Sequence, residues 1–452
     1  MNKVLVYTKD PSPRFEYVIR HIEGYFNNLS LESCGELEVY LQWTGLSIQH
    51  GQEDLKLKEF KMNRSVHFDK TLDKLIEDGE DFLQTIHCSA EISQDFDLIS
   101  AIFWHLSRIE EYFPIALDHH GRFPASKSIL FKKNILHLPL VDLWIFEWAK
   151  KLEDFFGMSI HLKPQLTDWS VGIDVDQFYK HQHKPLFKKL GGCLKDLSSG
   201  KLTDVWERIQ IYSGLIKDPY DTYEEVRKLN IPKSSLCYFI LSGGQSPYDK
   251  NHSLRQKVIL LKIKDLERFS EIGLHPSYES NRQSDLIKRE LHTLQQCCSE
   301  PIVKSRQHYL RIGLPDTYRL LIEAGIQEDY SMGYAEQTGF RAACCRPFHW
   351  YDLQREQSTE LIIVPFSLMD RTYLTYLKYQ PSQAILDMQS LWDTCKKYQG
   401  HFHIIWHNSS FDFLGEWKNW DGVFEKMVTQ LIDLPKNEDP TIKSRETSIR
   451  NL

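Results

Sequence analysis

Short apolar runs alternate with stretches of helical period through the C-terminal two-thirds of the chain. After Asp168, runs rich in β-branched and aromatic residues recur at residues 171–176, 234–241, 271–278, 301–310, 325–334, 360–366 and 401–408. Between several of these runs, as at 286–297 and 318–325, apolar residues recur with the period of a helix. Strands that alternate with helices indicate βα units, so the pattern predicts an α/β fold with a parallel sheet, such as an α/β barrel.

The first 150 residues have a different pattern. They open with a predicted strand at 3–7 and a predicted helix at 14–26, followed by a polar stretch and a long amphipathic helix at 98–113. Residues 118–157 predict a loop with glycine and proline, a short strand and an aromatic-rich helix. We therefore expect an α/β N-terminal domain over 1–160, a second domain over 165–435 with the boundary at 163–169, and a polar, frayed tail over 436–452.

Composition narrows the class of protein. The chain has 452 residues with 55 basic and 62 acidic side chains, a length that normally forms two or three domains with buried cores. No basic block is interleaved with aromatic residues, so we expect no nucleic-acid partner. The apolar runs are too short for a secretory signal or a transmembrane segment, which predicts a cytoplasmic protein.

Cysteine and paired histidine give weaker signals. The nine cysteines include two adjacent pairs, Cys297–Cys298 and Cys344–Cys345, and no CxxC pair, which predicts buried thiols and no disulfide framework or thiolate zinc site. His119 and His120 would point apart on a regular element, so a solvated loop is favoured there over a metal site.

Two carboxylates end the first apolar run of the second domain. Asp174 and Asp176 are one residue apart, so on an extended backbone both project from the same face. At a strand end they can share a cation or divide the roles of base and ligand. The alternatives are a polar turn and the metal clamp of a nucleotide-sugar glycosyltransferase.

Three histidines end or follow later runs. His275 precedes Pro276, His308 follows Arg306 in the next run, and His407 ends the last run. Parallel strands deliver their C-terminal ends to one edge, so these groups are expected to meet the two aspartates there. Neutral imidazoles with a carboxylate are the usual protein ligands of a catalytic metal, and a histidine on the rim suits a proton donor near neutral pH.

A family resemblance rests on particular blocks of sequence. The blocks IGLHPSY, SRQHYLR, LPDTY, DYSMGYAEQTGFRAACCRPFHWYDL, PFSLMD and WHN resemble a bacterial branch of the polysaccharide deacetylases of carbohydrate esterase family 4, the NodB-homology type. In that branch an uncharacterised α/β domain precedes the deacetylase domain. The resemblance covers about residues 168–433 and implies a distorted (β/α)7 barrel.

The resemblance also implies a metal site. The adjacent aspartates of the family, a base and a metal ligand, are matched by Asp174 and Asp176, which are not adjacent here. The family's two histidines four residues apart are matched by His275 and by Glu279 in the second place. Glu279 is then a substitute ligand, or His308 replaces it, or the site holds no metal; we favour His308, with a divalent metal such as Zn²⁺ on Asp176, His275 and His308.

The remaining motifs imply the proton-transfer and substrate groups. Arg306 matches the arginine that holds the base Asp174, and His407 matches the general acid. Tyr334, Arg341 and Trp350, in the segments taken as loops after residue 328, are candidates for contact with a sugar, although a core role is equally compatible with the aromatic residues.

The expected function is removal of an N-acetyl or similar group from an N-acetylated glycan or a lipid-linked sugar precursor. One alternative, suggested by Glu279, is a deacetylase barrel that has lost catalysis and acts as a glycan-binding or scaffold protein. The other is a glycosyltransferase using Asp174 and Asp176, which leaves the three histidines without a task.

Overall fold

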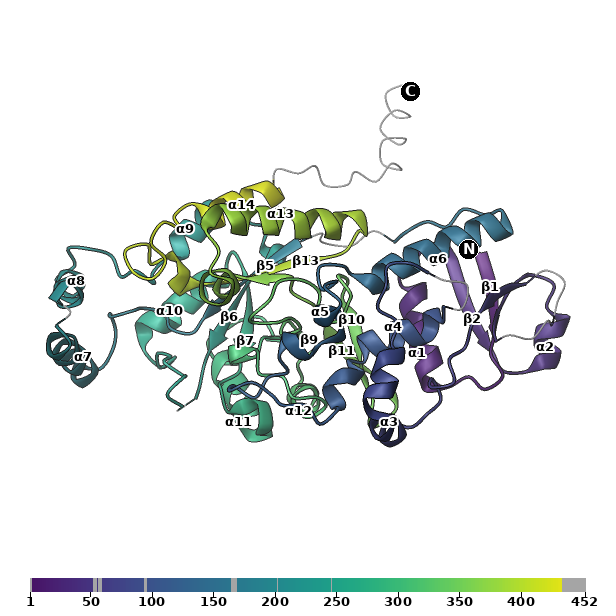
Figure 1. Ribbon diagram of the computed structural model, residues 1–452. Helices are drawn as coiled ribbons and strands as arrows, with labels where there is room; N and C mark the ends of the chain where they lie inside the picture. Colours follow the sequence, from purple (N-terminus) through teal and green to yellow (C-terminus); the bar gives the residue numbers. More distant parts are fainter. Residues whose placement is uncertain are drawn as a thin grey trace, which may run out of the picture.

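The computed structural model describes residues 2–51, 55, 59–92, 96–163, 169–200, 202–244 and 246–432. Two sheets organise this part of the chain, a small one near the N-terminus and a large one after it (Figure 1). The predicted tail at 436–452 and most of the predicted boundary at 163–169 lie outside the described residues. Among the helices that are described, none combines the length and the apolar character that crossing a membrane requires.

The small sheet has the strand order β2-β1-β3-β4, and all its strands are parallel. The strands are β1 (Asn2–Tyr7), β2 (Leu29–Cys34), β3 (Leu46–His50) and β4 (Phe60–Met62). The helices of this half are α1 (Pro13–Glu23), α2 (Leu37–Gln42), α3 (Leu72–Thr85), α4 (Leu98–Leu106), α5 (Ile129–Lys132) and α6 (Leu140–Phe156). The predicted strand at 3–7 and helix at 14–26 are confirmed as β1 and α1.

Two predictions for this half are wrong. The helix expected over 98–113 ends at Leu106, because Arg108 adopts the left-handed conformation (φ 56°), and a short 3-10 turn follows at Ile109–Tyr112. The short strand expected within 118–157 does not form, since its apolar residues make the single helical turn α5 instead.

The large sheet has the order β10-β11-β9-β8-β7-β6-β5-β13-β12. Its strands are β5 (Trp169–Val175), β6 (Leu236–Leu241), β7 (Glu271–His275), β8 (Lys304–Ser305), β9 (Glu328–Asp329), β10 (Phe348–Asp352), β11 (Gln357–Ile363), β12 (Leu368–Met369) and β13 (Phe402–His407). Its helices are α7 (Leu186–Ser198), α8 (Leu202–Tyr212), α9 (Tyr223–Lys228), α10 (Lys257–Leu266), α11 (Ser284–Gln295), α12 (Asp316–Ala324), α13 (Pro381–Lys397) and α14 (Val423–Ile432). Only the pair β10–β11 is antiparallel.

The paired strands form an open sheet, with β10 and β12 at its edges, so the closed (β/α)7 barrel is not confirmed. The chain between β11 and β12 nevertheless bonds to both sides of the sheet. Val364 N donates to Asp329 O (2.9 Å) at the end of β9, and Ser367 N donates to His403 O (2.9 Å) on β13. The mixed α/β architecture with a mainly parallel sheet agrees with the hydrophobic pattern.

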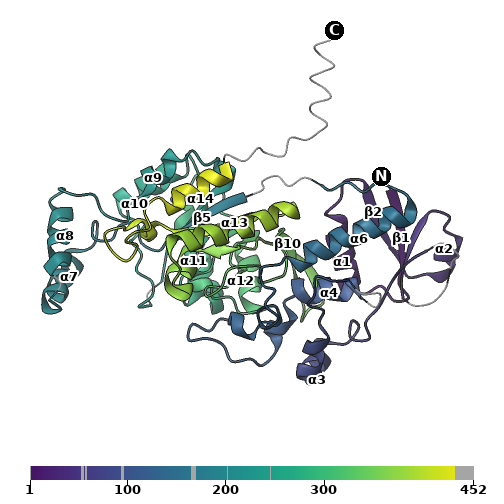
Figure 2. The ribbon, with the colours of Figure 1, turned by 45° about the horizontal axis from the view of Figure 1, so that its top comes forward.

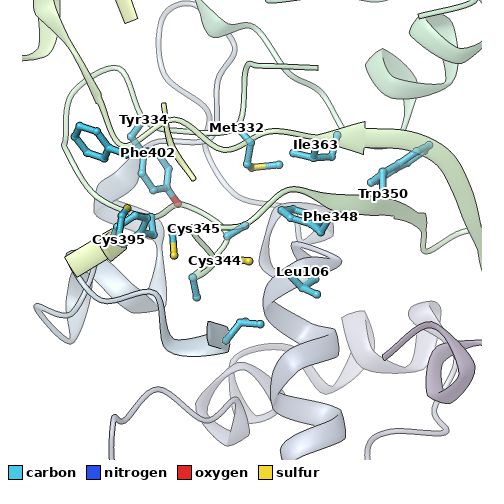
Figure 3. Packing of buried hydrophobic residues seen from close by; sticks show 14 of the residues in the cluster. Leu106, Met332, Tyr334, Cys344, Cys345, Phe348, Trp350, Ile363, Cys395 and Phe402 are labelled. Carbon is cyan, nitrogen blue, oxygen red and sulfur yellow. The ribbon is translucent and has the colours of Figure 1, made fainter. Parts of the chain in front are cut away.

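The two halves share one continuous hydrophobic core. Helix α4 of the first half lies beside β10 of the large sheet (Figure 2). At their junction, Asp142 of α6 accepts hydrogen bonds from the Tyr25 hydroxyl (2.8 Å) and from Cys345 N (2.8 Å). All nine cysteines are free and six are buried, as the sequence predicts. Figure 3 shows Cys344, Cys345 and Cys395 within this packing.

Candidate active site

The C-terminal ends of the parallel strands bring five titratable groups to one edge of the large sheet. Asp174 lies near the end of β5 with Asp176 just beyond it, His275 ends β7, His308 follows β8, and His407 ends β13. All five line one cavity of about 420 Å³. The structure therefore brings together the groups that the sequence singles out.

Three of these groups could hold a metal ion. Asp176 Oδ1 lies 3.3 Å from His275 Nε2 and 3.5 Å from His308 Nε2, and the candidate ligand atoms of the three all lie within 4.8 Å of one another. Asp176 Oδ1 is buried and accepts no hydrogen bond. An acceptor oxygen without a donor, facing two imidazole nitrogens, fits a divalent cation such as Zn²⁺.

The hydrogen bonds on the far side of each imidazole orient it toward Asp176. His275 Nδ1 donates to the carbonyl oxygen of Arg306 (2.5 Å), and His308 Nδ1 lies 3.0 Å from Asp249 Oδ1. A proton on each Nδ1 leaves both Nε2 atoms free to act as ligands.

Asp249 was not singled out by the sequence. Its carboxylate is buried and accepts hydrogen bonds from Tyr278 N (3.0 Å) and from the Ser246 hydroxyl (2.7 Å), so it is held in place to receive His308. It lies in a polar loop after β6, where an aspartate looks like an ordinary turn former. No local signal in the sequence distinguishes it.

Asp174 is held by a buried arginine. Arg306, with no exposed surface, donates through one guanidinium nitrogen to Asp174 Oδ1 (2.8 Å), and its Nε donates to Tyr330 O (3.2 Å). Its guanidinium occupies the space that a side chain at Gly172 would need, so glycine in β5 makes room for it. Asp174 Oδ2 remains directed at His275 Nε2 (3.9 Å) and His407 Nε2 (4.0 Å).

His407 is held by a buried carboxylate. His407 Nδ1 lies 2.8 Å from Asp370 Oδ1, and the backbone N–H of His407 donates to Asp370 Oδ2 (2.7 Å). Burial lowers the pKa of His407, but the charge and the hydrogen bond of Asp370 outweigh burial and raise it to about 9. Asp370 ends the block PFSLMD, and its place beside β13 could not be read from the sequence.

The other expected site residues lie elsewhere. Glu279 has a 57% exposed side chain, lies near Arg311 (3.9 Å), and is not one of the three candidate ligands. Tyr334, Arg341 and Trp350 are buried and do not line the cavity. Figure 3 shows Tyr334 and Trp350 in hydrophobic packing, with Trp350 on β10, a strand where a loop was expected.

The N-terminal half also contributes to the cavity. Arg122 lines it, pairs with Asp118 (2.7 Å), and donates to Tyr309 O (3.1 Å) and to the Tyr376 hydroxyl (3.3 Å). The expected loop is confirmed for His119 and His120, and His119 is exposed. His120 is buried instead of solvated, with its Nδ1 3.0 Å from the Tyr278 hydroxyl. Further aromatic residues on the cavity wall are Tyr220, Tyr248, Tyr309 and Tyr376.

Comparison with known proteins adds a family match for the N-terminal half and a distant structural neighbour. Residues 4–157 match the model of a family of unknown function, DUF7033. No curated protein matches the chain. A crystal structure of a "putative polysaccharide deacetylase" from Mycobacterium smegmatis resembles it with a TM-score of 0.39 at 14% identity, covering 60% of this chain and 87% of that one.

Proposed function

We propose that this protein is a metal-dependent hydrolase that removes an N-acetyl or similar acyl group from an amino sugar of a cell-envelope glycan or its precursor. One observation carries the proposal: three different arrangements converge on a single cavity. They are a set of two imidazoles and a carboxylate, a carboxylate held by a buried arginine, and an imidazole held by a buried carboxylate.

The cation would be held by Asp176, His275 and His308, and we take it to be Zn²⁺. Three protein ligands leave a position for water or substrate. When bound, such an ion polarises an acyl carbonyl and makes water more acidic. Asp249 would keep His308 in the orientation that ligation needs.

Asp174 would be the general base. Arg306 donates a charge-assisted hydrogen bond to Asp174 Oδ1, which fixes the orientation of this carboxylate. On its other side Arg306 contacts His403, whose pKa burial holds well below its usual value. Asp174 Oδ2 faces the cavity, where it can take the proton of an attacking water.

His407 would be the general acid. Asp370 accepts the proton of Nδ1, so Nε2 is the atom that carries a second proton into the cavity. Its pKa, raised to about 9, keeps the ring protonated at neutral pH. The ring can then protonate the leaving nitrogen, which gives a free amino sugar and acetate.

We further propose that the large sheet is a distorted barrel of the deacetylase type. The segment from β11 to β12 bonds to the end of β9 on one side and to β13 on the other, which joins the two arms of the sheet. On the cavity wall, the rings of Tyr220, Tyr248, Tyr309 and Tyr376 replace Tyr334 and Trp350 as the candidates for stacking on a sugar.

No observation favours either of the two alternative functions, the glycosyltransferase or the glycan-binding protein. A glycosyltransferase built on Asp174 and Asp176 leaves the Asp370–His407 pair without a task. A glycan-binding protein without catalysis was suggested by Glu279, but His308 lies where a third ligand is needed.

Acetate release from N-acetylated oligosaccharides, measured before and after chelation, tests the proposal. Treatment with a chelator should remove the activity, and added Zn²⁺ or Co²⁺ should restore it. Acetate release that survives complete removal of metal would contradict a metal-dependent hydrolase.

A further inference from the structure

A helical hairpin projects from the large sheet. The connection from β5 to β6 contains α7 and α8, which extend away from the rest of the chain in both views (Figures 1 and 2).

The face between the two helices is polar. Arg208 of α8 donates to Asp196 of α7 (2.5 Å), and a side chain at Gly192 would collide with the Arg208 guanidinium. A second Arg208 nitrogen lies 2.9 Å from His181 Nδ1 at the base of the hairpin. The two helices therefore contact each other through an ion pair and a glycine. Paired helices usually bury apolar side chains such as leucine between them.

The apolar residues point outward instead. Leu190, Leu194 and Leu197 recur at the spacing of one helix face, and Leu194 is 67% exposed. On α8, Trp206 is 60% exposed and Ile209 lies three residues further on the same face. Single exposed leucines are ordinary, but rows of exposed apolar residues on each of two helices in contact indicate an interaction surface.

The charge of the hairpin selects the partner. From residue 184 to the end of α8 at residue 212 the sequence has six basic residues, five of them lysines, and three acidic residues, Asp196, Asp204 and Glu207. Asp196 pairs with Arg208, and Glu207 pairs with Lys180 outside the hairpin. The whole chain carries a net charge of −7, so this segment differs in sign from the rest. Two copies joined through this face would bring their lysines together, whereas an anionic lipid surface would neutralise them.

We propose that the α7–α8 hairpin docks the protein on an anionic membrane surface. The exposed leucines and Trp206 enter the headgroup region, and the net positive charge of the segment is attracted to lipid phosphates. Leucine with tryptophan on one face and lysine on the other is the composition of helices that lie in the membrane interface.

The β5–β6 connection that carries the hairpin passes the cavity at both of its ends. Gln177 before α7 and Tyr220 after α8 both line it, and Asn408 donates to the carbonyl oxygens of both (2.9 and 3.1 Å). Docking would therefore hold the cavity close to the lipid surface. A cavity close to the lipid surface favours a lipid-linked amino sugar among the substrates of the proposed function. This choice of substrate rests on the proposed function, whereas the docking of the hairpin does not.

Vesicle co-sedimentation of the full-length protein tests the docking. The probes are phosphatidylcholine vesicles with and without phosphatidylglycerol. The double variant Leu194→Glu with Trp206→Glu should lower binding to the anionic vesicles by at least about tenfold, because it places two charges at the lipid interface. The matched control is Leu261→Glu with Leu386→Glu, two similarly exposed leucines on α10 and α13.

The expected result is binding by the wild type and by the control, a loss with the hairpin variant, and weaker binding at high salt. Equal binding by all three proteins, or no binding by the wild type, would overturn the proposal. So would a wild-type dimer in sedimentation velocity that the hairpin variant dissociates, without vesicle binding, since the face would then join two copies. The assay needs neither metal nor substrate, so its failure and a failure of the hydrolase proposal are separate results.

Discussion

His407 and Asp174 face each other across the cavity, and the proposed function gives them opposite proton-transfer tasks. Because the acid must be protonated, turnover should decline as pH rises through the pKa of His407. Asp370 is the main group that raises this pKa to about 9, so Asp370→Asn should move the alkaline limb of kcat/KM down by about one to two pH units. An alkaline limb that stays in place would contradict the assigned acid.

Metal binding should depend on pH through His308. Burial lowers the pKa of His308, but Asp176 and Asp249 outweigh burial and raise it to about 9 in the metal-free protein. Below that pH a proton competes with the cation, so the affinity for Zn²⁺ should rise as pH increases toward about 9. Calorimetry of Zn²⁺ binding in two buffers with different ionisation enthalpies tests this, because the difference in heat between the buffers gives the number of protons that binding releases.

Two substitutions separate ligation from orientation. His275→Ala should abolish Zn²⁺ binding, and Asp249→Asn should weaken it by about 10–100-fold, because His308 loses the partner that orients it. His292→Ala, at an exposed position on α11, is the matched control and should bind normally. Stoichiometric metal in His275→Ala would remove this site from the account.

At the residue scale, the sequence predicted the groups that follow strand ends. Asp174, His275 and His407 could be found because each ends a run of apolar residues. Asp249 and Asp370 could not, since nothing local distinguishes an aspartate that orients a histidine from one in a turn. The contacts that decide their roles join residues 59 and 37 positions apart.

At the scale of elements, Asp218 fastens the base of the hairpin. Its buried carboxylate accepts the backbone N–H groups of Lys180 (2.7 Å), His181 (2.8 Å) and Gln182 (3.0 Å). Asp218→Ala leaves these donors without an acceptor, which costs about 1–3 kcal/mol for each that stays buried. Hydrogen exchange at 180–182 should become faster, while Asp196→Ala, within the hairpin, should leave it unchanged. Unchanged exchange in Asp218→Ala would show that the base is held by other contacts.

The sequence predicts strands correctly where a long apolar run forms a long strand. β6 and β13 lie within predicted runs, but the runs at 301–310 and 325–334 form only the two-residue strands β8 and β9. In the first run a 3-10 turn at His308–Leu310 follows β8, and in the second Ser331 donates to the side chain of Asp329 just after β9. The sequence pattern predicts a loop where β10 forms, because β10 pairs in the antiparallel direction with β11, which follows it after a turn.

At the scale of the whole molecule, a buried ion cluster joins the two halves. Glu111 of the N-terminal half accepts hydrogen bonds from Arg341 Nε (2.9 Å) and from Arg108 Nε (2.8 Å), and all three side chains are buried. Arg341, a candidate from the sequence for contact with substrate, is bonded to Glu111 in this cluster and does not line the cavity. The sequence could not reveal it, because the partners are 230 positions apart.

Glu111→Ala should destabilise the protein by about 3–5 kcal/mol, because the buried Arg341 guanidinium loses its carboxylate partner and Arg108 keeps only Glu110. Because the halves share one core, denaturant unfolding should show a single transition at a lower midpoint. Glu147→Ala, which removes an exposed ion pair with Lys150, should change stability by less than about 1 kcal/mol. Two separate transitions in the wild type would contradict a shared core.

The most direct test of the central claim is acetate release by Zn²⁺-loaded wild type and His407→Ala on the same N-acetylated oligosaccharide or lipid-linked sugar. The account predicts release by the wild type, and a rate about 10²–10⁴-fold lower in His407→Ala with metal content and folding unchanged. Equal rates in the two proteins would remove His407 from the mechanism. No acetate from any such substrate, with stoichiometric metal bound, would contradict the hydrolase itself.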